Sequence, residues 1–264
     1  MTLNKEYIMS FICIFLEPAL WYTLIGAVVG AIVSFIFMRI NECHKGKNRI
    51  ELYTSDIRLL TKQSMQYLEL CMKNMQKYVG KIETNAYVPQ QLQEGVLEPF
   101  KRIQRLNTTM VYEAFKEQGK GDKYIPFFQY IDQFYMILEG VYTDYREHNR
   151  TIVLFINEFQ ELVADSIYLC QQSNHSNVRD VLKKYDDLKQ GDNVQVDISF
   201  IHNNFVEPLL CILTPSDMKL FAKVDRANFL YNSVIAHQHC FAKNVSQVQK
   251  DLETSMAGLK RMRL

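Results

Sequence analysis

An uncharged apolar stretch near the N-terminus is the strongest pattern along the chain. Residues 19–38 are twenty consecutive positions without a charged side chain. A helix rises about 1.5 Å per residue, so this stretch reaches about 30 Å, the thickness of the hydrocarbon core of a bilayer. It is longer than the apolar part of a signal peptide, and it ends in bulky rather than small residues. The pattern therefore predicts a retained membrane-spanning helix over residues 18–40.

A second apolar segment precedes this span. Residues 8–16 are apolar and end at Glu17 and Pro18. Nine residues cannot cross a bilayer alone, and proline suits the first turn of a helix. We expect residues 1–17 to form a short apolar segment at the membrane interface. The alternative, one tilted helix of about 31 residues, stays open at this point.

The charges that flank the span predict its orientation. Four basic residues and one acidic residue follow it within eleven positions, whereas Lys5 and Glu6 balance each other before it. Basic residues are retained on the cytoplasmic side of a membrane. The N-terminus is therefore expected outside and the rest of the chain in the cytoplasm. The predicted interface anchors are two aromatic and three basic residues: Trp21, Tyr22, Arg39, Lys45 and Lys47.

The span also carries small residues at a spacing of four. Gly26 and Gly30 form a GxxxG motif, and a second row runs beside it. Small residues let two membrane helices approach closely and pack. We expect a self-association face in the bilayer, with lipid and a second copy of the chain as partners. Its members are Thr23, Gly26, Ala27, Gly30, Ala31 and Ser34.

The remaining residues, 41–264, predict a cytoplasmic helical domain. Apolar positions recur every three or four residues from 53 to 82, which indicates a long stalk helix over about 50–82. Gly46 lies in the polar segment before it, so the stalk either continues from the span or hinges there. A linker is predicted at 83–99, where Pro89, Gly95 and Pro99 occur.

Residues 100–264 predict a helical bundle, and the whole chain an all-α fold. We expect a helix over 100–118, then two helices joined at Asn149 and Arg150 as a hairpin, and a short helix ending near residue 189. The last helix runs to the C-terminus with coiled-coil-like spacing. Residues 194–200 alternate between apolar and polar types and predict an extended segment, although no partner strand is evident.

Composition narrows the function classes. Hydrophobic residues make up 48% of the 264 positions and charged residues 22%, which is typical of a folded globular protein. The net charge of +1 supplies no field that would attract nucleic acid, which we do not expect as a partner. The six cysteines form no CxxC pair, which favours reduced thiols.

No motif predicts catalysis, a metal or a cofactor. On a helix His237 and Cys240 lie on the same face, whereas His239 lies on another. Two ligands are too few for zinc, which needs three or four. We expect His237 to be a core residue. Gly119 and Gly121 with a nearby lysine lack the full phosphate-loop pattern. The acidic side chains of Glu158, Glu161 and Asp165 are expected to form a solvated helix face.

Arg39 and His44 form an Arg-x4-His pair. Some helical ribonucleases pair arginine and histidine at this spacing. The pair lies where the span leaves the membrane, and anchoring is a sufficient role for Arg39.

Three functions follow in order of preference. The first is a non-enzymatic single-pass membrane protein that self-associates through its span and presents a cytoplasmic interaction or sensing module. The second is an oligomeric pore or membrane-perturbing effector gated by the cytoplasmic domain. Its layout is similar, in architecture alone, to that of small single-span helical proteins of prokaryotic antiphage defence. The third is a helical membrane-bound nuclease.

Overall fold

The described part of the chain is entirely helical in its regular structure. The computed structural model describes residues 18–191, 194–214 and 217–261, and for residues 18–24 the backbone alone. Within these ranges there is no β-strand, which confirms the predicted all-α class. The helices are α2 (Pro18–Thr84), α3 (Glu98–Gln104), α4 (Thr108–Glu117), η1 (Gly121–Lys123), α5 (Tyr124–Gln172), α6 (Ser176–Lys189), α7 (Ile198–Ile201), the π-helix η2 (His202–Val206), α8 (Glu207–Ile212) and α9 (Met218–Lys260).

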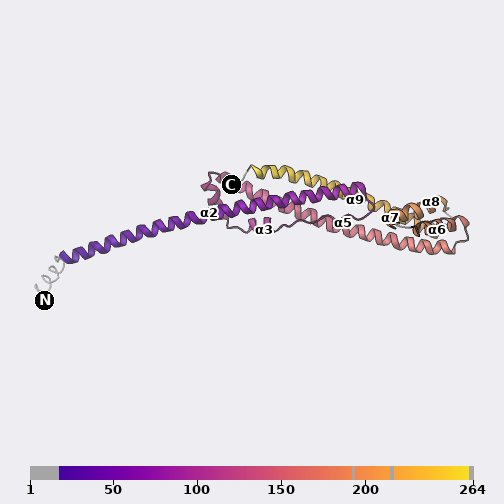
Figure 1. Cartoon of the computed structure of the whole chain (residues 1–264), viewed down its shortest axis with the longest axis horizontal. Coiled ribbons are helices and arrows are strands. Elements are labelled where there is room, and N and C mark those ends of the chain that lie inside the picture. Colours follow the sequence, from indigo (N-terminus) through magenta and orange to yellow (C-terminus); the bar gives the residue numbers. More distant parts are fainter. Residues whose placement is uncertain (1–17, 192–193, 215–216, 262–264) are drawn as a thin grey trace, which may run out of the picture. The chain divides into compact units, whose positions relative to one another are not determined.

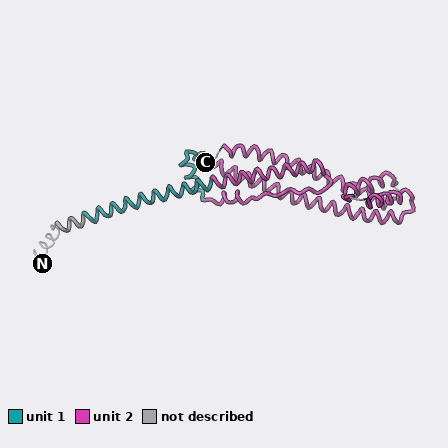
Figure 2. The backbone as a smooth tube through the Cα atoms, viewed as in Figure 1, with its two compact units in different colours: residues 1–57, 107–121 teal, residues 58–106, 122–264 magenta. Residues whose placement is uncertain are grey.

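The chain divides into two compact units, shown in different colours in Figure 2. Unit 1 comprises residues 1–57 and 107–121, and unit 2 comprises residues 58–106 and 122–264. The predicted interfacial segment, residues 1–17, lies outside the described residues. Helix α2 contributes residues to both units.

Within unit 1, α2 stays helical through Gly46. Of the two arrangements that the sequence left open at this position, the structure has the continuous helix.

The predicted helix over 100–118 is wrong, because the chain forms α3 and α4 instead. The side chain of Asn107 accepts a hydrogen bond from the backbone N–H of Met110 at 3.1 Å, which starts a new helix at Thr108.

Unit 2 contains α5 and α9, which lie side by side (Figure 1). Two ion pairs join them: Lys223 lies 2.6 Å from Asp165, and Arg226 lies 2.8 Å from Glu158. The predicted hairpin connection at 149–150 is wrong, because α5 is helical from Tyr124 to Gln172. No glycine or proline interrupts that region, and the buried positions continue across it.

The part of α2 in unit 2 buries the predicted apolar stripe. Tyr78 lies between α5 and α9, with its ring 6.1 Å from that of Tyr145 and 5.8 Å from that of Phe241, both edge-on. Helix α2 ends at Thr84, two residues after the predicted end of the stalk helix. The buried members of the stripe in this unit are Ser64, Leu68, Cys71, Met75, Tyr78 and Ile82.

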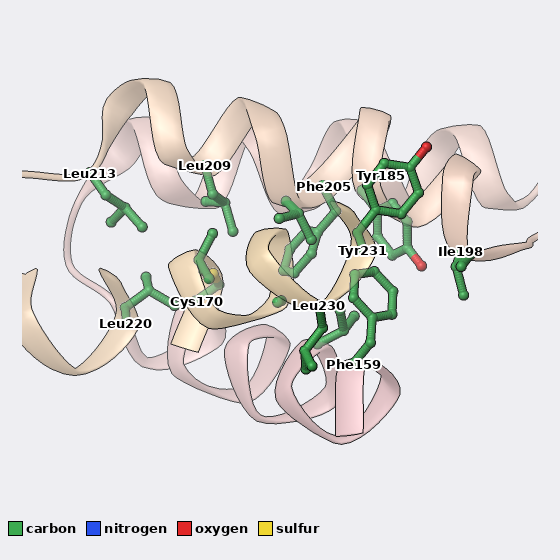
Figure 3. Packing of buried hydrophobic residues seen from close by; sticks show 14 of the residues in the cluster. Phe159, Cys170, Tyr185, Ile198, Phe205, Leu209, Leu213, Leu220, Leu230 and Tyr231 are labelled. Carbon is green, nitrogen blue, oxygen red and sulfur yellow. The ribbon is translucent and has the colours of Figure 1, made fainter. Parts of the chain in front are cut away.

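A second part of the core of unit 2 involves the shorter helices. Figure 3 shows side chains from α5, α6, η2, α8 and α9 packed together there. The ring of Tyr185 on α6 lies 5.1 Å from that of Phe205 on η2. The predicted extended segment over 194–200 is wrong for its last three residues, which begin α7. The carboxylate of Asp197 caps this helix by accepting from the N–H of Phe200 at 2.8 Å.

The linker between α2 and α3 is fastened by one buried side chain. Residues 85–97 contain no helix. Gln238 on α9 is 1% exposed, and its Nε2 donates to the carbonyl oxygens of Ala86 and Val88. Its Oε1 accepts from the backbone N–H of Gln90 at 3.3 Å. The side-chain amide of Gln238 thus forms hydrogen bonds with three backbone groups of the linker, which has no regular secondary structure to pair them.

The linker also passes close to α2 and α5 at Gly95. A Cβ atom at this position would collide with the sulfur of Cys71 and would lie 2.8 Å from the hydroxyl of Tyr142. Only glycine therefore fits at this close approach.

Replacing Gln238 by leucine should destabilise unit 2. The substitution keeps the approximate volume but leaves the carbonyl group of Ala86 and the N–H of Gln90 without this partner, whereas the carbonyl group of Val88 keeps the side-chain amide of Gln90. The change should lower the free energy of unfolding by about 2 kcal/mol. Chemical denaturation measures this change. Hydrogen exchange should also accelerate at the N–H of Gln90.

Gln247→Leu on the same helix is the matched control. Gln247 is exposed, and among the described residues its side chain bonds to Asp251 alone, at 3.0 Å, so its loss should change stability by less than about 0.5 kcal/mol. If both variants unfold at the same denaturant concentration as the natural protein, Gln238 does not hold the linker.

Candidate functional site

The most distinctive surface of the protein is the apolar part of α2 in unit 1. Every described side chain from residue 25 to residue 45 is exposed. The large apolar ones between residues 25 and 40 are 45–68% exposed, which soluble proteins avoid over a contiguous surface. The helix is long and apolar enough to cross a membrane. These residues are Ile25, Val28, Val29, Ile32, Val33, Phe35, Ile36, Phe37, Met38 and Ile40.

The small residues of the predicted self-association face lie on this helix. Ala27, Ala31 and Ser34 are exposed, and a Cβ added at Gly26 or Gly30 would meet no described atom within 4 Å beyond the neighbouring backbone of α2 itself. A spacing of three or four residues places them along one side of a helix. For Thr23, Trp21 and Tyr22 the structure describes the helical backbone but not the side chains. The face is therefore open along its described length.

The predicted basic anchors follow the apolar surface. Arg39, Lys45 and Lys47 are exposed, and the guanidinium carbon of Arg39 lies 5.9 Å from the ring centre of Phe35. Exposed cations at the end of an apolar helix suit the polar headgroup layer of a membrane.

Arg39 and His44 line a shallow cleft of about 270 Å³ on α2. Its other lining residues are Ile40, Cys43 and Lys47. The cleft brings the Arg-x4-His pair together on one side of the helix. Among its described lining residues there is no carboxylate, so a partner group that would orient His44 is not supplied here.

The histidines of α5 and α9 form a small ring cluster in unit 2. The prediction that His237 is a core residue is wrong, because its side chain is exposed. Its ring lies 6.2 Å from that of His148, which stacks on Phe241 at 4.5 Å. Burial and the neighbouring His237 lower the pKa of His148 to about 4, so this imidazole is neutral near pH 7.

The polar residue that the sequence interpretation missed is Gln238. It lies next to His237, and its signal was its spacing of four residues from both Val234 and Ala242, which are buried. Spacing of this kind marks a core-facing position even when the residue is polar.

The other candidates for chemistry have structural roles. Glu158 and Asp165 form the ion pairs to α9, whereas Glu161 is exposed. Gly119 follows the end of α4 and has a φ of 68°, a conformation that favours glycine. This backbone conformation accounts for a glycine at position 119 without a phosphate-binding role. Among the described residues, no three His, Cys, Asp or Glu side chains lie close enough together to hold a metal ion.

Comparisons with protein-family models, with curated proteins and with solved structures find no match for this chain.

Proposed function

We propose that the protein is a single-pass membrane protein that self-associates through α2 and presents a cytoplasmic helical bundle as an interaction or sensing module. The exposed apolar surface of residues 25–40 carries this proposal. In water such a surface is unfavourable by roughly 25 cal/mol for each Å² left exposed, and a bilayer removes that cost. The long helices α5 and α9 supply the soluble-type part of the molecule.

The orientation follows from charge. Arg39, Lys45 and Lys47 are exposed directly after the apolar surface, and basic segments remain on the cytoplasmic side during insertion. In this arrangement the N-terminus is outside and unit 2 is in the cytoplasm.

Self-association is supported by the open space at Gly26 and Gly30. Apart from the backbone of α2 itself, no described residue lies close to either position, so no described contact requires glycine there. A glycine inside a helix is destabilising by about 1 kcal/mol relative to alanine. Close approach of a second α2 would make the small residues useful, because helices in lipid associate by packing rather than by the hydrophobic effect.

Replacing both Gly26 and Gly30 by leucine should abolish the association. The added side chains meet open space in the isolated chain, so folding should be unaffected, but they would keep two helices apart. We expect the dissociation constant to rise by at least about tenfold, or about 1.4 kcal/mol. Sedimentation equilibrium in detergent measures it.

Val28→Leu with Val29→Leu is the control, since both residues are exposed on other sides of the same helix. This variant should associate like the natural protein. An oligomer that persists in the Gly26→Leu, Gly30→Leu variant would show that the small-residue face is not the interface. A ring of six or more copies that makes vesicles leak would favour the pore instead.

Cys43 offers a test of orientation. Its thiol is exposed, and it lies four residues after Arg39. A membrane-impermeant maleimide added to intact cells should leave Cys43 unlabelled, and permeabilised cells should be labelled, as quantified by mass spectrometry of the peptide. In an Asn4→Cys variant the new thiol should react in intact cells. The reverse pattern would place unit 2 outside.

A further inference from the structure

Unit 2 contains a polar cleft between α2 and the linker. Its volume is about 280 Å³. One wall is a side of α2 that presents residues at spacings of three and four, and the other wall is linker residues 91–93. The lining residues are Asn74, Lys77, Tyr78, Lys81, Gln91, Leu92 and Gln93.

The linker wall is held on both sides of the cleft. Gln238 fastens it at Ala86, Val88 and Gln90, and the side-chain amide of Asn74 lies 3.5 Å from the carbonyl oxygen of Gln93. Between these points Leu92 is 4% exposed and anchors the segment in the core. The cleft is thus a consequence of tertiary structure rather than a gap beside a loose loop.

The polar groups around the cleft are mainly hydrogen-bond donors. Lys77 and Lys81 are one helical turn apart and exposed, and neither ammonium group forms an ion pair with a described residue. The side-chain amides of Gln91 and Gln93 are also exposed and make no hydrogen bond within the described residues. Like charges at this spacing repel each other on a bare helix.

Tyr78 and Leu92 complete the lining of the cleft and are almost fully buried, at 1% and 4% exposure. The ring of Tyr78 packs edge-on against the rings of Tyr145 and Phe241. The exposed lysines and side-chain amides therefore supply the polar groups that a ligand in the cleft would meet.

We propose that this cleft binds a small phosphate-bearing anion. Two unpaired ammonium groups would neutralise a doubly charged phosphate, and the amides would donate to its remaining oxygens. Lysine binds phosphate as a mobile point charge, which suits a shallow site open to solvent. The phosphate belongs to a soluble molecule or to a lipid headgroup, since the recognition chemistry is the same. The site rests on unit 2 alone and does not depend on the proposed span.

Calorimetric titration of the full chain with pyrophosphate tests this site. The protein is held in nanodiscs of phosphatidylcholine, which carries no net charge. The natural protein should bind pyrophosphate, and Lys77→Gln with Lys81→Gln should weaken binding by at least about tenfold. Repeating the titration in nanodiscs that contain phosphatidylglycerol identifies the source, because a headgroup in the cleft would compete with pyrophosphate and a distant one would not.

Lys183→Gln with Lys184→Gln is the matched control. Both lysines are exposed on α6, and the pair removes the same two charges away from the cleft. This variant should bind pyrophosphate within about twofold of the natural protein. Circular dichroism verifies that both double variants are folded. The proposal is overturned if the natural protein binds no pyrophosphate, or if both double variants weaken binding equally.

Discussion

The removal of one apolar surface from water is the constraint on which the rest of this structure depends. Ten large apolar side chains between residues 25 and 40 of α2 are 45–68% exposed. At about 25 cal/mol per Å², leaving them in water is unfavourable by on the order of 10 kcal/mol, comparable to the whole stability of an ordinary domain. A surface of this size has to be covered by lipid or by protein. The uncharged length of the segment favours lipid.

The same helix meets a different environment farther along its sequence. After residue 50 the exposed side of α2 is mainly polar, although Leu52, Leu59 and Leu70 remain exposed, and the opposite side buries a stripe that ends at Ile82. In unit 2 this stripe contacts rings from α5 and α9, whose exposed sides exchange ion pairs. Exposed pairs of this kind contribute less than about 1 kcal/mol each, so aromatic and aliphatic packing accounts for most of the stability.

Periodicity predicted the elements whose stability comes from a repeated apolar side. The stalk part of α2 and the long α9 both follow from spacings of three and four. Periodicity did not predict where a polar residue such as asparagine begins a new helix and where it lies inside a continuous one. Asn107 starts a helix through one hydrogen bond, whereas Asn149 lies inside α5, and the two asparagines look alike in sequence. Local capping is decided by tertiary packing around each residue, which spacing does not report.

The same limit applies to the candidate sites. The small-residue face was readable because all its members lie on one helix, but the cleft near Lys77 joins residues from α2 to a linker without regular structure. Gln238, which positions that linker, bonds across about 150 positions in sequence. Contacts of this range require the folded chain.

Extraction of membranes with alkaline carbonate tests the central claim most directly. The full-length protein should remain in the membrane pellet at high pH and enter solution only with detergent, because the proposed arrangement embeds the apolar segment of α2 in hydrocarbon. Recovery of the intact protein in the carbonate supernatant would contradict the account, since α2 would then be covered by protein rather than by lipid.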